Sequence, residues 1–181
     1  MKKRNLFFAL LVMGGLAKTY SQTYKHSFGV NLGATQDGIG AMLNYNYFIQ
    51  GDNSFAASVL VTDAKYSVQG NKIGYNDFTL NLGYSTPLYS TKNRKFAILL
   101  GVGGVVGYEI VNGNKSSTLS NGNLILEDSK TIYGAYSGLD IDYLINDRMT
   151  VFIKANEYYH ANSDLGKFVP FAGLGLRYYA N

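Results

Sequence analysis

The sequence predicts an all-β fold, an eight-stranded antiparallel up-and-down β-barrel of the kind that spans a bacterial outer membrane. Apolar and small polar residues alternate with period two over most of the chain after residue 24. Glycine and tyrosine are abundant, at 21 and 16 residues, as suits curved strands and aromatic residues at a membrane interface. After the N-terminus, no 18 consecutive residues are apolar, so the pattern does not predict a spanning helix.

The N-terminus has the pattern of an export signal. Three basic residues, Lys2, Lys3 and Arg4, precede an apolar run from Leu6 to Ala17. Small residues before Gln22 suit cleavage, and the apolar run is too short to cross a bilayer as a helix. A retained N-terminal anchor is the alternative. We expect a signal peptide at residues 1–21 and one barrel domain at residues 22–181, located in the outer membrane.

The charge balance depends on this cleavage. The whole chain has 16 Lys and Arg residues against 12 Asp and Glu residues. Residues 1–21 hold Lys2, Lys3, Arg4 and Lys18 and no acidic residue, so 16 − 4 = 12 basic residues remain against 12 acidic ones. A neutral chain lacks the one-sided positive field that nucleic-acid binding needs, so we expect no direct contact with nucleic acid. The sequence has no cysteine, which excludes disulfides and thiolate metal sites.

Each predicted strand has one apolar face and one face of small polar residues. In the clearest case, Phe78, Leu80 and Leu82 alternate with Thr79 and Asn81. The predicted strands lie at about residues 27–34, 39–49, 55–62, 78–85, 96–110, 133–143, 151–156 and 172–178. In a soluble sandwich the apolar faces would form a core, whereas in a membrane barrel they meet lipid. The Gly- and Asn-rich polar faces favour a narrow lumen over a solvent-facing surface, and therefore the barrel.

Aromatic residues tend to lie at the ends of the apolar faces, as expected for girdles at the two membrane interfaces. The predicted girdle consists of Tyr45, Tyr84, Phe96, Tyr108, Tyr133, Tyr143 and Tyr178. With an even number of strands and a periplasmic N-terminus, the turns near Asn53, Lys92 and Asp147 would be periplasmic. The predicted extracellular loops are Gln36–Gly38, Tyr66–Gly74, Asn112–Lys130 and Ala161–Lys167. The third is the longest, so we expect it to be a recognition surface.

Four charged residues lie on the polar faces of the last three strands. A tight turn between two of these strands would place Asp140 opposite Lys154, and Asp142 would then lie near Arg177 across the lumen. A lone buried charge is costly, so we expect these side chains to form ion pairs that close the lumen. A gated pore or a ligand site is the alternative interpretation.

Other motifs give weaker indications of chemistry. The glycines from Gly101 to Gly107 resemble a dinucleotide fingerprint, but they lie inside a strand pattern and no helix follows. His160, with Ser163 and Asp164 nearby, could form a lipid-hydrolase site at the outer rim, whereas His26 belongs to the opposite end. His and carboxylate residues do not cluster, so we expect no metal site and no cofactor.

The C-terminal half resembles a known family. The segments that match are Gly107–Asn112, Leu124–Leu126, Ile132–Ala135, Tyr143–Arg148 and Phe168–Tyr178. Together they resemble the conjugal transfer protein TraO family of Bacteroides-type conjugative transposons. The likeness extends from about residue 96 to the end, and only the signal peptide and strand rhythm match before it. The last three residues, 179–181, lack the terminal Phe common in outer-membrane barrels.

This resemblance implies a non-enzymatic outer-membrane component of a conjugative (mating) DNA-transfer apparatus, with no catalytic residues. Its expected partners are outer-membrane lipid and other proteins of the mating apparatus. A general small barrel for adhesion or envelope integrity is one alternative, and the lipid hydrolase at the rim is another.

Overall fold

The computed structural model describes residues 24–68, 71–111, 128–163 and 166–181, which form eight antiparallel strands. The strands are β1 (His26–Thr35), β2 (Gly38–Gln50), β3 (Asn53–Val68), β4 (Asn71–Ser90), β5 (Phe96–Val111), β6 (Lys130–Asn146), β7 (Met149–His160) and β8 (Phe168–Ala180). Within the described residues, no helix is long and apolar enough to cross a membrane. The predicted signal peptide, the insert Leu124–Leu126 and Asp164 lie outside the described residues.

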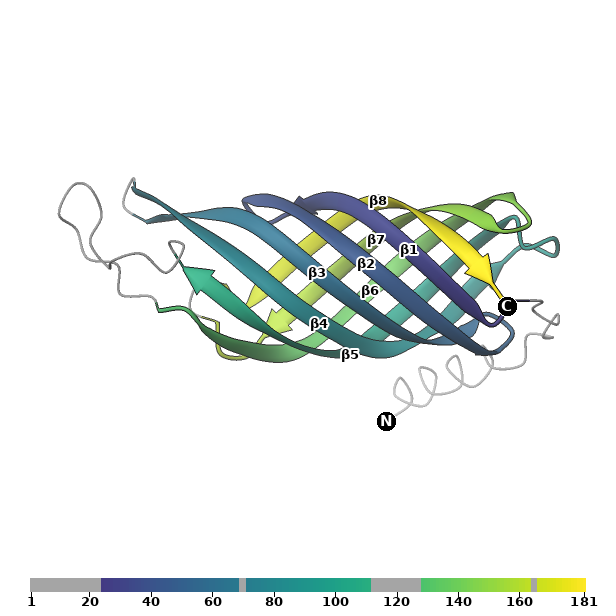
Figure 1. Cartoon of the computed structure of the whole chain (residues 1–181), viewed down its shortest axis with the longest axis horizontal. Helices are drawn as coiled ribbons and strands as arrows, with labels where there is room; N and C mark the ends of the chain where they lie inside the picture. Colours follow the sequence, from purple (N-terminus) through teal and green to yellow (C-terminus); the bar gives the residue numbers. More distant parts are fainter. Residues whose placement is uncertain (1–23, 69–70, 112–127, 164–165) are drawn as a thin grey trace, which may run out of the picture.

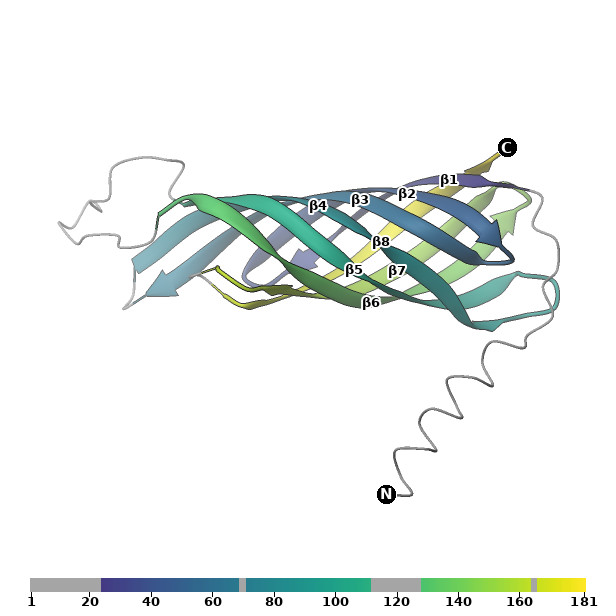
Figure 2. The ribbon, with the colours of Figure 1, turned by 90° about the horizontal axis from the view of Figure 1, so that it is seen from below.

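Each strand pairs with its sequence neighbours, and β1 pairs with β8 to close the barrel. This closing register runs from His26 opposite Ala180 to Thr35 opposite Phe171. Figure 1 shows the strands inclined to the long axis, and Figure 2 shows the same barrel turned by 90°. We call the end that holds His26 and Ala180 the terminal end, and the opposite end the loop end. The predicted fold class is therefore confirmed.

The outward face is apolar over its whole height. Among the described residues, thirty large hydrophobic side chains are exposed, including Leu32 at 66 % and Leu174 at 60 %. In water such a surface would be a large aggregation site, whereas in a bilayer it faces hydrocarbon. Most of its exposed residues come from the positions that the period-two pattern placed on the apolar faces. Leu88, Tyr89, Ile145, Tyr159 and Phe168 lie beyond the predicted strand ends.

The seven predicted girdle residues all lie at outward strand positions, in two groups. Those at the terminal end are Tyr45, Tyr84, Phe96, Tyr143 and Tyr178. Those at the loop end are Tyr108 and Tyr133, on the neighbouring strands β5 and β6. Further exposed aromatic residues extend both groups: Phe28, Tyr47, Phe55 and Tyr89 at the terminal end, and Phe78, Tyr159 and Phe168 at the loop end. Aromatic residues therefore lie near both ends of the apolar wall, and at the loop end the described ones come from β4 to β8.

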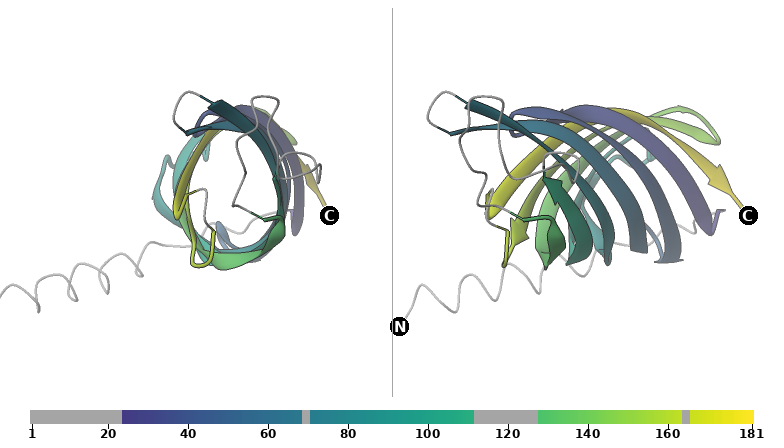
Figure 3. Two further views of the ribbon diagram at one scale, coloured as in Figure 1. Left: turned by 90° about the vertical axis from the view of Figure 1, so that its left-hand side faces the viewer. Right: turned by 60° about the vertical axis from the view of Figure 1, so that its left-hand side comes forward.

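The interior contains an apolar cluster that the sequence analysis did not predict. The cluster, which we call the plug, consists of Met42, Leu60, Val105, Tyr158, Val169 and Phe171, with Tyr136 packed against it. An eight-stranded barrel is just wide enough for side chains to fill it, and Figure 3 (left) shows this narrow cross-section along the axis. The sequence analysis expected Gly, Ser and Asn in the lumen. The plug residues occupy other inward positions on the same strands.

Several predicted boundaries differ from the structure, because β3, β4, β7 and β8 are longer than predicted and β2 already begins at Gly38. The loop expected at Tyr66–Gly74 is largely strand, because β3 continues to Val68 and β4 begins at Asn71. Cross-strand pairing from Lys65 opposite Gly74 to Val68 opposite Asn71 extends the hairpin beyond the predicted point. The last residue of the predicted loop Asn112–Lys130 belongs to a strand, because β6 starts at Lys130. Residues 112–127 lie outside the described part of the chain.

Candidate functional site at the terminal end of the lumen

The structure brings the four predicted lumen charges together. β6 supplies Asp140 and Asp142, β7 supplies Lys154 and β8 supplies Arg177. Asp140 lies directly opposite Lys154 in the β6–β7 register. Arg177 pairs with Thr150 in the β7–β8 register, and its long side chain reaches both carboxylates on β6. All four belong to the inward set because each has the same strand parity as its neighbouring Gly and Asn residues.

The charges form a connected and neutral set, which we call the charged layer. Lys154 Nζ donates to Asp140 Oδ1 at 2.5 Å, and Arg177 Nη2 donates to Asp140 Oδ2 at 2.8 Å. The second terminal nitrogen of Arg177, Nη1, donates to Asp142. The guanidinium lies over the Phe152 ring, 4.5 Å from its centroid, and Arg177 is only 3 % exposed. Two carboxylates and two cations thus compensate one another where water has little access.

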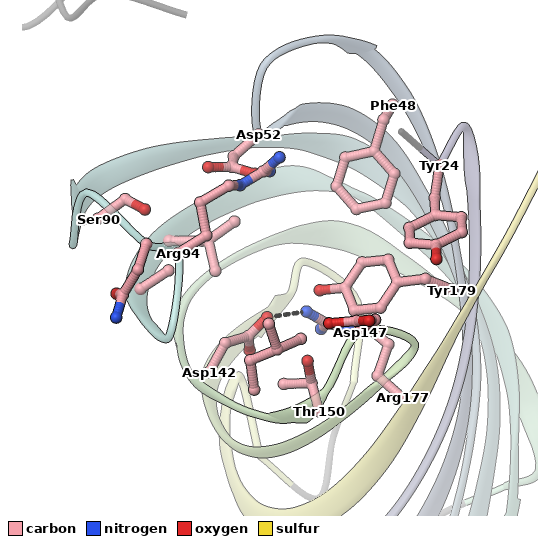
Figure 4. A pocket seen from close by; sticks show the side chains of 14 residues that line it. Tyr24, Phe48, Asp52, Ser90, Arg94, Asp142, Asp147, Thr150, Arg177 and Tyr179 are labelled. Carbon is pink, nitrogen blue, oxygen red and sulfur yellow. Dashed lines mark hydrogen bonds and ion pairs between the residues drawn. The ribbon is translucent and has the colours of Figure 1, made fainter. Parts of the chain in front are cut away.

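Two polar atoms of the charged layer have no hydrogen-bond partner: Asp142 Oδ1 and Arg177 Nε. Both residues line a pocket of about 360 Å³ that opens at the terminal end, which we call the mouth pocket. Figure 4 shows this pocket, with the bond between Asp142 and Arg177 drawn among the residues that line it. Buried polar groups usually have hydrogen-bond partners, so these two atoms mark the charged side of the pocket as a candidate binding site.

The mouth pocket has an aromatic side and a charged side. Tyr179 lies 5.8 Å from Phe48 and 6.2 Å from Tyr24, measured between ring centroids, and all three rings line the pocket. On the charged side, Arg94 forms an ion pair with Asp52. This ion pair joins the β4–β5 turn to the β2–β3 turn, which are far apart in the sequence.

Arg94 has an unusual backbone conformation. Its φ is 55°, in the left-handed region, which is uncommon for a residue with a side chain. Its N–H donates to Thr91 O at 2.8 Å, so the turn holds this conformation. The turn thereby directs a guanidinium to the pocket wall at the cost of local strain, a combination that is often found at functional sites.

Comparison with known proteins now identifies the family. The sequence model described as "Conjugative transposon protein TraO" matches residues 9–180. The chain belongs to this TraO family. The resemblance stated from the sequence motifs is therefore confirmed, and it extends over nearly the whole chain. Among curated proteins, the sequence has no match.

Solved structures show the same fold as this TraO-family chain. The crystal structure of Ail, the attachment invasion locus protein of Yersinia pestis, matches with a TM-score of 0.59 and 11 % identity, covering 88 % of this chain and 100 % of that one. The N-terminal β-barrel domain of Pseudomonas aeruginosa OprF matches with a TM-score of 0.51 and 12 % identity, again covering 88 % and 100 %. At these identities the likeness shows the barrel fold alone.

The residues considered for a hydrolase site do not form a nucleophile–base pair in the described structure. Ser163 Oγ donates to Glu109 Oε2 at 2.8 Å. His160 is 2 % exposed, and both of its ring nitrogens lack a hydrogen-bond partner. His26 lies at the other end, where its Nδ1 is 2.8 Å from the Tyr45 hydroxyl. Within the described residues, no group of three His, Cys, Asp or Glu side chains could hold a metal ion.

The glycines from Gly101 to Gly107 lie within β5, as the sequence analysis expected. At Gly103, an added Cβ would lie 2.3 Å from the backbone oxygen of Leu82 and 2.6 Å from Tyr136 Cε1. Close approach of the neighbouring strand and of a lumen aromatic residue explains this glycine without a nucleotide.

The sequence analysis missed the mouth pocket and the plug. The plug had a usable signal, because Tyr136, Tyr158 and Phe171 share strand parity with inward Gly and Asn residues. The sequence contains no signal for the pairing of Asp52 with Arg94, because this pairing depends on how two turns approach one another in space.

Proposed function

We propose that the protein is a non-enzymatic outer-membrane component of a conjugative transfer apparatus and that it assembles with other proteins of that apparatus. The observation on which this proposal rests is the family match over residues 9–180 on a closed barrel with an apolar outer wall. Aromatic residues near both ends of that wall suit the two interfaces of a bilayer. The terminal end lies in the periplasm and the loop end faces the medium, as in other barrels with short periplasmic turns.

The interior favours a docking role over a conduit. The plug packs side chains from six strands, β2, β3, β5, β6, β7 and β8, and the charged layer lies on its terminal side. A lumen filled in this way leaves no route for a DNA strand, and an equal number of acidic and basic residues in the mature chain gives no attraction for phosphate. We therefore expect the protein to contribute to transfer by binding other proteins at the two ends of the barrel.

Deletion of the gene from its conjugative element tests this function. Mating frequency should fall, and it should recover when the wild-type gene is supplied in trans. The protein should fractionate with outer membranes and should change its migration on gels after heating, as a folded barrel does. Unchanged mating after deletion would contradict the proposal and would leave the adhesion or envelope-integrity alternative. Lipid release by the purified protein, lost in His160→Ala, would instead support the hydrolase.

A further inference from the structure

The charged residues are sorted along the barrel axis. The terminal end has five basic residues and two acidic ones: Lys25, Lys92, Arg94, Lys95 and Arg148, with Asp52 and Asp147. The charged layer contributes two of each sign. The described loop end has four lysines and six acidic residues: Lys65, Lys72, Lys130 and Lys167, with Asp37, Asp63, Asp77, Glu109, Asp128 and Glu157. The formal side-chain charge of the described residues is therefore 5 − 2 = +3 at the terminal end and 4 − 6 = −2 at the loop end.

Basic residues lie on two turns beside the mouth pocket, whose own charged lining consists of Arg94, Arg177, Asp52, Asp142 and Asp147. Lys92 and Lys95 are exposed and flank Arg94, which lines the pocket. Arg148 lies on the next turn, with its guanidinium carbon 5.9 Å from the centroid of the Tyr24 ring, and Tyr24 also lines the pocket. Lys92, Lys95 and Arg148, which we call the basic rim, therefore lie beside a concave site that has an aromatic wall and contains the unpartnered Arg177 Nε.

We propose that the mouth pocket and its basic rim bind an acidic segment of a periplasmic protein, with an apolar or aromatic side chain of that segment against the ring wall. This inference rests on the proposed orientation and function of the barrel. The side-chain excess of three positive charges at this end attracts a negative partner and increases its association rate. The rings of Tyr24, Phe48 and Tyr179 supply the apolar contact area that such an interface needs at its centre.

A protein segment fits this site better than lipid does. The pocket is bounded from inside the barrel by Leu99, Asp142 and Thr150, which are inward residues of β5, β6 and β7. Headgroups of the surrounding bilayer meet the outer wall, whereas these inward residues lie inside the barrel at its terminal end. A peptide that enters along the barrel axis can place carboxylates at the rim while its apolar side chain contacts the rings.

Binding by purified full-length mature protein in a neutral detergent tests the proposal. The probe is a fluorescent glutamate-rich peptide with interspersed phenylalanines, compared with the same peptide carrying glutamine in place of glutamate. We expect the glutamate peptide to bind more tightly and to weaken as salt is raised, because exposed charges are screened. In the double variant Lys92→Glu/Lys95→Glu, affinity should fall about tenfold, since two attractive contacts become repulsive.

Two variants separate this site from a general charge effect. Lys65→Glu/Lys167→Glu makes the same charge change on exposed residues of the loop end and should leave peptide affinity unchanged. Asp52→Asn should increase affinity, because the Asp52 carboxylate competes with the peptide for Arg94. All variants should keep the heat-dependent gel shift of the folded barrel. Equal binding of the two peptides, or an equal loss in the loop-end variant, would overturn the proposal.

Lipid and mating measurements complete the test. If Lys92→Glu/Lys95→Glu changed only the preference of the barrel for nanodiscs containing phosphatidylglycerol, the rim would be a headgroup site and the proposal would be wrong. In donor cells this variant should reduce mating while the loop-end pair does not. Normal mating by the rim variant, with mating lost on gene deletion, would refute the inference alone. Rim-dependent peptide binding with no mating defect on deletion would refute the proposed function alone.

Discussion

Among single residues, the members of the charged layer are not equivalent. Asp140 bonds to both Lys154 and Arg177, and Arg177 bonds to both Asp140 and Asp142. Lys154 and Asp142 each have one partner among these four charges. Removing a residue with two partners leaves two charges undercompensated, whereas removing Lys154 leaves Asp140 still paired with Arg177.

Asp140→Ala should therefore lower the free energy of unfolding more than Lys154→Ala does. The loss for Asp140→Ala should approach about 3–5 kcal/mol, the range for a broken buried ion pair, reduced to the extent that water reaches the lumen. The double variant should lose less than the sum of the two single losses. Urea unfolding in detergent or lipid measures all three values, and strictly additive losses would mean that these two charges do not interact.

At the level of strands, the alternation of apolar and polar residues was sufficient to predict most of the fold. It placed the eight strands and their two faces, because an eight-stranded barrel alternates inward and outward residues along every strand. Alternation did not reveal the plug. An apolar residue on a small polar face, such as Phe171, is a single departure from the pattern of its strand, and only the three-dimensional structure shows that six strands bring such residues together. The mouth pocket could not be predicted either, since the Asp52–Arg94 pair depends on turn conformations, including the left-handed Arg94.

The plug should contribute strongly to stability. Phe171 is 1 % exposed within it, so Phe171→Ala leaves a cavity and should cost about 3–5 kcal/mol, less where water fills the space. Leu174→Ala is the control, because Leu174 lies three residues away on the same strand and points outward. It should cost clearly less, because lipid chains can fill the space that it leaves. Comparable losses in thermal unfolding would indicate that the cluster is not closely packed.

For the whole molecule, the fold and the orientation in the membrane are separate questions. The closed barrel with both described ends of the chain at one end is an observed feature. The periplasmic position of that end is a prediction. The formal charge of the described residues differs between the two ends, so the orientation decides which charge faces the periplasm.

Single introduced cysteines can test the orientation, because the sequence contains none. Lys167→Cys lies at the loop end and should react with a membrane-impermeant maleimide on intact cells. Lys92→Cys lies at the terminal end and should react only after the outer membrane is permeabilised. Both residues are exposed in the structure, so burial does not confound the comparison. The reverse pattern would show that the barrel is inserted with the opposite orientation.

The pairing of β1 with β8 has a consequence for biogenesis. All ten residues of β1 pair with β2 on one side and with β8, the last strand to be synthesised, on the other. Until that strand is available, β1 and β7 remain open edges, which readily pair with other chains. A chain that forms this barrel must therefore be kept from pairing with other chains until its final residues are available. A nonsense mutation before β8 would then prevent closure of the barrel rather than shorten it.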